Sequence, residues 1–294
     1  MFELVQVNEK TYYIESPAKI GVYAADEHNV YLIDSGNDKD AGRKIRKLLD
    51  EKGWTLKGIL NTHSNADHIG GNDYLQRQRK CKVFTGGIET AFTKYPILET
   101  SFLYGGYPCK DLRHKFLLAA ASDAVDFSDA DFPKEVEVIP LPGHFFDMVG
   151  FRTPDQTVFL ADCLSSEETL DKYAVSFIYD VAAYLKTLDA VETMDAAVFV
   201  PSHAAAGSAA DMRKLVRINR DKIFEIKAYI LSVCREPMMF ECVLQHVFAH
   251  YNLAMTIEQY VLVGSTIRSY LSWLRDTGDM TYVFEDGRML WKTI

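Results

Sequence analysis

The sequence contains no apolar run close to the roughly 20 residues that a membrane-spanning helix needs. Its first residues, Met1-Phe2-Glu3-Leu4, also lack the basic start and the apolar stretch of a secretory signal. Cysteine is scarce: the five residues are widely spaced, odd in number and without a CxxC pair, which is typical of reduced thiols rather than of a disulfide framework. From these absences we expect a soluble protein of the cytoplasm.

Positive charge is also in short supply, with 32 lysine and arginine residues against 41 aspartate and glutamate residues and a net charge of −9. Nucleic-acid backbones are bound by basic surfaces, so this balance argues against DNA or RNA as the main partner. The glycine patterns that cradle nucleotide phosphates, GxGxxG and GxxxxGK, are absent. With 48% hydrophobic residues, the 294-residue chain has the composition of an ordinary globular protein.

The first part of the chain alternates predicted strands with predicted helices. Short strands are expected at residues 2–7, 11–15, 19–24, 29–33 and 58–60, with a helix over 40–52 that ends at Gly53. Residues 89–131, called the insertion below, break this pattern because they are rich in aromatic and small residues. We predict a helix followed by a loop excursion there, of the kind that covers a site.

Later segments return to strands and then change to helices. Strands are expected at 135–139, 149–152, 158–160 and 197–200, with one helix over about 167–193. Three helices and two strands follow, at about 208–234, 238–251 and 256–276 and around the turn Asp286-Gly287. Helix, helix, helix, hairpin is the outline of a winged helix. We therefore expect two domains, residues 1–207 and residues 208–294.

The strongest chemical signal lies in residues 61–72, where His63, Asp67 and His68 stand within six residues, after a buried strand and before a helix. Imidazole nitrogen and carboxylate oxygen are ligands that zinc and similar metals take. Three more candidate ligands follow later predicted strands: His144, Asp162 and His203. Strands that end at the same edge of a sheet bring such side chains together, so the pattern predicts a metal site.

In this pattern the chain resembles the metallo-β-lactamase superfamily, whose motif His-x-His-x-Asp-His is followed by a separate histidine, aspartate and histidine. The resemblance spans about residues 2–207. It implies an α/β fold, a four-layer αβ/βα sandwich with the metal site at one sheet edge. The implied ligands are His63 and His144 for the first metal, Asp67, His68 and His203 for the second, and Asp162 as the bridge.

The motif departs from the family at one position, because Asn65 stands where the family has its second histidine. An amide oxygen is a weaker ligand than imidazole for a metal such as zinc, so Asn65 is a candidate ligand of a weakened first site. The resemblance implies two zinc ions. Manganese or a single iron ion are the alternatives, since two histidines and one carboxylate are also the donors of mononuclear iron oxygenases. Asp34 matches the family's Asp-x-Gly turn, which supports the site without ligating a metal.

The resemblance implies hydrolysis of a small ester, thioester or related substrate, as in the glyoxalase II-like group. A metal-activated water would attack the substrate, with Asp67 ligating the metal and orienting this nucleophile. Two alternatives stay open: a mononuclear iron enzyme similar to persulfide dioxygenases, and a nucleic-acid-binding or RNA-cleaving protein. We expect a small-molecule substrate, no membrane partner and a homodimer. The winged helix is expected to shape the substrate entrance or a dimer contact rather than to bind DNA.

Overall fold

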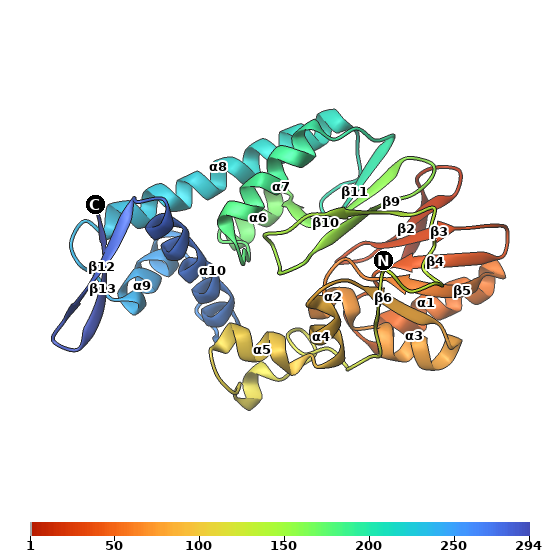
Figure 1. The fold of residues 1–294 in the computed structure, drawn as a ribbon, viewed down its shortest axis with the longest axis horizontal. Helices are drawn as coiled ribbons and strands as arrows, with labels where there is room; N and C mark the ends of the chain where they lie inside the picture. Colours follow the sequence, from red (N-terminus) through yellow and green to blue (C-terminus); the bar gives the residue numbers. More distant parts are fainter. Residues whose placement is uncertain (1) are drawn as a thin grey trace.

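The computed structural model describes residues 2–294 and packs a seven-stranded sheet against a four-stranded one (Figure 1). The strands of the first sheet follow one another in chain order: β1 (Glu3–Gln6), β2 (Thr11–Glu15), β3 (Ile20–Ala24), β4 (Asn29–Ile33), β5 (Thr55–Leu60), β6 (Lys82–Thr85) and β7 (Val125–Asp126). The second sheet has the order β11-β10-β9-β8, with β8 (Glu137–Pro140), β9 (Val149–Arg152), β10 (Thr157–Ser165) and β11 (Val198–His203). Strands β4 to β7 pair in parallel, so their carboxyl ends share one edge.

Helices cover the outer face of each sheet and complete four layers. On the first sheet lie α1 (Lys39–Lys52), α2 (Ala66–Ile69) and α3 (Asn72–Arg79), and Leu49 of α1 packs against the sheet. On the second lie α7 (Val181–Thr193) and α8 (Ala209–Val233), and Leu188 of α7 belongs to the same buried apolar cluster as Leu160 of β10. Phe84 and Phe159 belong to the apolar layer between the sheets. The predicted αβ/βα sandwich is confirmed.

The prediction of one helix over 167–193 is wrong. The structure has α6 (Glu167–Tyr173), a gap, and then α7. The first helix ends because Ala174 takes a φ of +52°, outside the helical region. The second begins at Asp180, whose side chain accepts a hydrogen bond from the backbone N–H of Ala183. Phe177 lies in this gap, and its carbonyl oxygen contacts Nδ1 of His144.

The insertion contains more regular structure than the single helix expected there. It forms α4 (Glu89–Lys94), α5 (Ile97–Tyr104), the short 3₁₀ helix η1 (Lys110–Leu112) and β7, which adds the last strand to the first sheet. Helix α5 lies against α10 (Ile257–Asp276) (Figure 1). The insertion therefore connects the first sheet to the C-terminal helices.

The C-terminal region has the expected order of elements: α8, α9 (Phe240–His250), α10, and the hairpin of β12 (Met280–Glu285) and β13 (Arg288–Thr293). One buried apolar cluster runs from the second sheet through α7 and α8 into α9 and α10. The side chain of Asn219 in α8 also exchanges two hydrogen bonds with the backbone of Ser165 in β10. A winged helix, and a domain boundary at residue 208, stay predictions. Within residues 2–294, no helix is both long and apolar enough to cross a membrane.

Candidate metal centre

Six of the predicted ligands converge where the two sheets meet at one edge. They come from the loop after β5, from α2, from the loop after β8, and from β10 and β11: His63, Asp67, His68, His144, Asp162 and His203. Their ligand atoms form two groups, within each of which all atoms lie within 4.8 Å of one another: His63, His144 and Asp162, and Asp67, His68, Asp162 and His203. Asp162 belongs to both groups, as expected of a bridging ligand.

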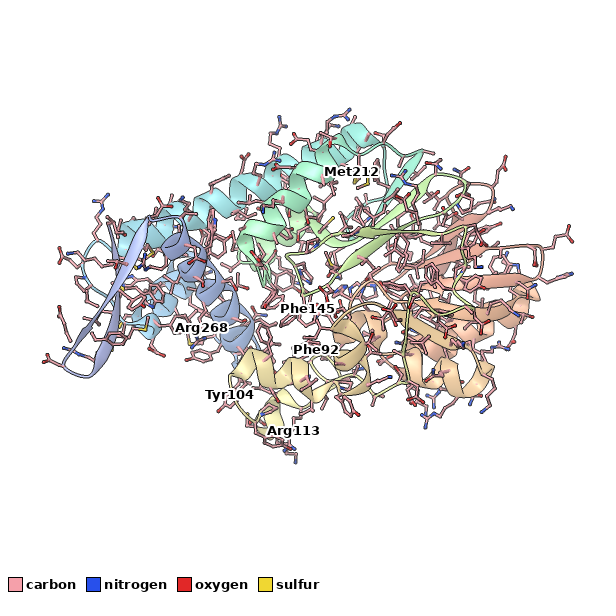
Figure 2. The ribbon with its side chains drawn as sticks, viewed as in Figure 1. Phe92, Tyr104, Arg113, Phe145, Met212 and Arg268 are labelled. Atoms are coloured by element: carbon pink, nitrogen blue, oxygen red, sulfur yellow. The ribbon has the colours of Figure 1, made fainter. Side chains whose placement is uncertain are left out.

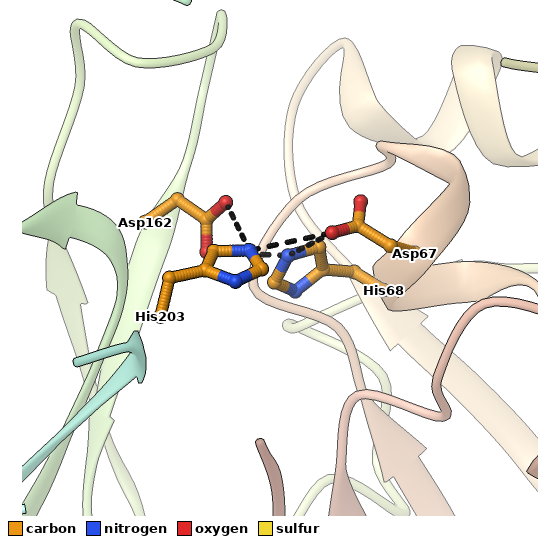
Figure 3. Close-up of side chains that lie close together, drawn as sticks. All are labelled: Asp67, His68, Asp162 and His203. Carbon is orange, nitrogen blue, oxygen red and sulfur yellow. Dashed lines mark ion pairs between the residues drawn. The ribbon is translucent and has the colours of Figure 1, made fainter. Parts of the chain in front are cut away.

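Figure 3 shows the second group, with Asp67 and Asp162 on opposite sides of two imidazoles. The Nε2 atom of His203 lies 3.1 Å from Oδ2 of Asp162 and 3.3 Å from Oδ2 of Asp67. The Nε2 atom of His68 lies 3.2 Å from Oδ1 of Asp162. Donor atoms from three separate chain segments thus face one point.

Two backbone irregularities aim these side chains. The sequence suggested that Asp162 follows its strand. In the structure β10 continues to Ser165, and Asp162 lies inside it. Just before it, Ala161 takes a φ of +50° where the register with β11 shifts, a β-bulge that re-aims the next side chain. Gly143, before His144, has a φ of +122°, and a Cβ there would lie 2.3 Å from the backbone nitrogen of Tyr184. Only glycine fits that position.

Two of the histidines are oriented by backbone carbonyls. The Nδ1 atom of His144 lies 3.0 Å from the carbonyl oxygen of Phe177, and Nδ1 of His203 lies 3.0 Å from that of Pro17. A carbonyl oxygen only accepts hydrogen bonds, so each Nδ1 carries the proton and donates it. Each Nε2 therefore directs a lone pair toward the centre when the ring is neutral.

The other two histidines are oriented through Asp34, which is buried behind them. Nδ1 of His68 donates to Oδ2 of Asp34 over 2.8 Å. The hydroxyl of Thr62 donates to the same carboxylate, so at 3.0 Å it accepts a hydrogen bond from Nδ1 of His63. All four imidazoles thus use Nδ1 on the protein and turn Nε2 inward, an arrangement typical of metal-ligating histidines.

Three of the atoms that face the centre lack a hydrogen-bond partner among the described residues. Nε2 of His63, Nε2 of His68 and Oδ1 of Asp162 are buried and without a hydrogen bond within the described part of the chain. Leaving buried polar atoms unpaired is costly, and native proteins rarely do so without an ion or water to satisfy them. Imidazole lone pairs mixed with carboxylate oxygens are a donor set suited to zinc, manganese or iron. The residues present fit a metal ion.

The charge of the site favours a cation. Asp162 raises the pKa of His203 to about 10. Burial lowers the pKa of His68, but the carboxylates of Asp162, Asp67 and Asp34 outweigh it and raise that pKa well above its ordinary value. Burial and the neighbouring His68 lower the pKa of His63. The carboxylates thus stabilise positive charge at the imidazoles around them, whether a proton or a metal ion supplies it.

Asn65 lies between the two groups and the insertion. Its Oδ1 is 3.2 Å from Nε2 of His144, and its Nδ2 donates to Oε1 of Glu99 over 2.6 Å. One residue earlier, the backbone N–H of Ser64 donates to Oε2 of Glu89 over 3.0 Å. Burial raises the pKa of Glu89 to about 7 and that of Glu99 well above its usual range.

Sequence reasoning missed both glutamates, which belong to helices of the insertion. A signal existed: each stands in a stretch otherwise dominated by apolar and aromatic residues. Glutamate is almost never fully buried unless it is paired, so a glutamate in such a stretch indicates a specific partner. The sequence does not reveal that the partners are the two residues after His63.

A cleft of about 680 Å³ opens over the centre. Its walls come from the insertion, α6 and α10, and include Phe116, Leu117, Tyr173 and Leu262. Among the described residues that line it, Lys172 is the only lysine or arginine. The rings of Phe92 and Phe145, labelled in Figure 2, pack with their centroids 5.2 Å apart, and the centroid of the Phe145 ring lies 6.2 Å from that of His63. Residues of the insertion thus line the cleft over the candidate centre.

Comparison with known proteins agrees with this architecture. A family model, the metallo-beta-lactamase superfamily, matches residues 16–203. A hydroxyacylglutathione hydrolase of Nitrobacter hamburgensis is 33% identical over 123 residues, which cover 42% of this chain and 39% of that protein. A hydroxyacylglutathione hydrolase of Rhodopseudomonas palustris is 30% identical over 158 residues, 51% of this chain and 53% of that protein. The chain therefore spans about half or less of the length of these curated relatives.

Solved structures match the fold over nearly the whole chain. A beta-lactamase domain protein from Burkholderia ambifaria has a TM-score of 0.74 at 15% identity, covering 99% of this chain and 94% of that chain. A metallo-beta-lactamase family protein from Thermus thermophilus has a TM-score of 0.72 at 17% identity, covering 97% of this chain and 99% of that chain. The C-terminal helices and hairpin are thus part of a fold that occurs elsewhere with the same sheets.

Proposed function

Because the chain belongs to the metallo-beta-lactamase superfamily, we propose that it is a metal-dependent hydrolase of small thioesters or related esters. The relatives named hydroxyacylglutathione hydrolase make acyl-glutathione thioesters the first substrates to test. The centre is proposed to hold two zinc ions. His63, His144 and Asp162 would hold the first, with Asn65 as a further ligand, and Asp67, His68, His203 and the shared Asp162 would hold the second.

The observation that carries the proposal is the shared orientation of four histidines. Each uses Nδ1 on a protein acceptor and turns Nε2 toward the centre that holds the shared carboxylate of Asp162. A core histidine with a structural role needs no such convergence. Bound metal would lower the pKa of water to near neutrality and polarise the substrate carbonyl.

Asp67 is proposed to orient the attacking water. Its side chain is 40% exposed at the floor of the cleft. One carboxylate oxygen faces the imidazoles and the other points away from them (Figure 3). Burial raises its pKa, but His68 and His203 outweigh this effect and hold the pKa below its usual range. The carboxylate is therefore ionised at neutral pH and able to accept a hydrogen bond from the attacking water.

The cleft suits a substrate with an apolar acyl group and limited negative charge. Leu117, Phe116 and Tyr173 offer apolar surface, while Lys172 offers one positive charge without an ion pair among the described residues. A carboxylate on the substrate would find its partner there. Substrate panels should therefore vary acyl length and charge separately.

A second candidate is a mononuclear iron enzyme acting on a persulfide. The specific observation behind it is the group of His63, His144 and Asp162, which offers two imidazoles and one carboxylate. This is the donor set of non-haem iron oxygenases. Elemental analysis separates the two candidates, because the hydrolase is expected to hold two ions per chain and the oxygenase one iron.

The test of the hydrolase combines metal content with thiol release. We expect the purified protein to release free thiol from acyl-glutathione thioesters, to lose this activity on chelation and to regain it with zinc. Asp67→Ala should lower kcat about 100-fold or more, since it removes the carboxylate that orients the attacking water, while the fold is retained. Near wild-type turnover by Asp67→Ala with full metal content would refute the role of Asp67. Absence of metal uptake would refute the proposed function.

A further inference from the structure

We propose that Glu99 is a positioning residue that holds the amide of Asn65 with its oxygen toward the first metal position. Asn65 would then supply an oxygen ligand where the family motif has a histidine. The inference rests on the proposed function, because it concerns the same metal centre. It assigns a role to a residue of the insertion, 34 positions further along the chain than its partner.

A hydrogen bond joins the side chains of Asn65 and Glu99. Nδ2 of Asn65 donates to Oε1 of Glu99 over 2.6 Å, a short and therefore strong contact. Glu99 is 4% exposed, so water does not compete freely for its oxygens. A carboxyl group keeps an accepting oxygen in either protonation state, and this oxygen matches the N–H of the amide. Once Nδ2 is engaged, Oδ1 points the other way.

Oδ1 of Asn65 faces the imidazole ring of His144. It lies 3.2 Å from Nε2 of His144. Nδ1 of that ring donates to the carbonyl of Phe177, so Nε2 presents a lone pair when the ring is neutral. Two lone pairs that face each other at this distance repel, and a cation between them satisfies both. The amide is therefore oriented as a ligand, not as a hydrogen-bond donor to His144.

The two metal positions differ in the number of carboxylates that face them. The second position is faced by two imidazoles and the carboxylates of Asp67 and Asp162. The first is faced by two imidazoles, the shared carboxylate of Asp162 and the neutral amide of Asn65. Glu99 places a carboxyl group directly behind that amide, and the hydrogen bond polarises the amide toward its oxygen. Glu99 thus compensates in part for the missing imidazole.

The test is a double-mutant cycle read out as metal affinity, not as activity. Zinc is titrated into metal-free protein in competition with a chromophoric chelator, which gives two stepwise dissociation constants. Glu99→Leu removes the acceptor, and we expect it to weaken the weaker of the two steps about 10- to 100-fold. The tighter step should stay within a few-fold of wild type. Glu99→Gln keeps an acceptor oxygen and should restore most of the affinity.

Asn65→Ala completes the cycle. It should weaken the same step, and adding Glu99→Leu to it should cause no further loss, because Glu99 acts through the amide. Glu168→Leu is the matched control: it removes another carboxylate of the same cleft, exposed and without a hydrogen bond to the metal-site residues. Both dissociation constants of this control should match those of wild type. Thermal unfolding checks that each variant is folded.

Several outcomes would overturn the inference. Equal weakening of both steps by Glu99→Leu, or the same weakening with and without Asn65, would mean that Glu99 acts through the fold or through its charge. Two unchanged affinities, or a single bound ion insensitive to Glu99→Leu, would also refute it. Wild-type protein that binds no metal would instead refute the proposed function. Two bound ions with an additive cycle would refute the inference alone.

Discussion

The sheet edge and the insertion contribute to the same centre in different ways. The sheet edge supplies every residue of the two candidate metal groups in the described chain, from strands β10 and β11, the loops after β5 and β8, and the short helix α2. Their orientation comes from partners in the same scaffold, such as Asp34 for His68 and the carbonyl of Pro17 for His203. These side chains are fixed by backbone that the sheets already hold in place.

The insertion supplies none of these groups and instead surrounds them. Glu89 holds the backbone of Ser64, Glu99 holds the amide of Asn65, and Phe116 forms part of the cleft wall. The difference suggests a division of labour, in which the sheet edge provides the chemistry and the insertion sets the metal affinity and the fit of the substrate. Variants of both regions test this division, from the strongest expected effect to the weakest.

The largest effect is expected at Asp162, the residue shared by both groups. Asp162→Asn removes a negative charge from both metal positions at once, and metal ions contribute several kcal/mol to such reactions. We expect kcat/KM for thioester hydrolysis to fall by about 1,000-fold, equivalent to about 4 kcal/mol. Bound zinc, measured by elemental analysis after dialysis, should fall below two ions per chain. Asp171→Asn, an exposed carboxylate of α6, is the control and should change neither quantity. Full zinc content in Asp162→Asn would show that Asp162 does not bridge the positions.

The next effect concerns stability and belongs to the insertion. Burial raises the pKa of Glu89 in the folded protein from 4.5 to about 7. Between these values the folded state binds more protons than the unfolded state, so the free energy of unfolding falls as pH rises. At 1.36 kcal/mol per pKa unit, the loss from pH 4.5 to pH 7 amounts to about 3 kcal/mol.

Urea unfolding of metal-free protein at a series of pH values measures this effect. Glu89→Gln cannot ionise, so its stability relative to wild type should improve as pH rises through this window. Glu168→Gln, at an exposed position, is the control. A constant difference between wild type and Glu89→Gln across the window would contradict the assignment.

The sequence predicted the sheet edge far better than the insertion, and the reason is physical. His144 and His203 could be found because a chemically distinctive residue stands at the end of a recognisable buried strand or shortly after it, and strands of one sheet end together. Asp162 was found for the same reason, although its strand continues past it through a bulge at Ala161. Such local rules do not extend to Glu99, whose partner is 34 residues away and whose role depends on how α5 packs. The break between α6 and α7 was missed because a single positive φ, at Ala174, leaves no mark on helical periodicity.

A smaller effect is expected where the two regions meet. Asn65→His restores the histidine of the family motif at the first metal position, and imidazole suits zinc better than an amide oxygen does. The weaker zinc dissociation constant should improve about tenfold, or about 1.4 kcal/mol. Glu99 would then accept a hydrogen bond from the new imidazole, as carboxylates do behind metal-ligating histidines. Unchanged zinc affinity in the folded variant would mean that position 65 does not face the metal.

The smallest effect is expected at the cleft wall, where the insertion meets the substrate. Phe116 is 62% exposed and lines the cleft, so it can bury apolar surface against a bound acyl group. Losing about 1 kcal/mol of such contact in Phe116→Ala should raise KM for long-chain acyl thioesters about fivefold. The kcat should stay close to wild type, because the metal ligands are untouched. Tyr104→Ala is the matched control, since this exposed aromatic residue of the insertion lines a separate cavity beside α10. If Phe116→Ala instead lowers kcat for every acyl length, the insertion takes part in the chemistry and the division from the sheet edge fails.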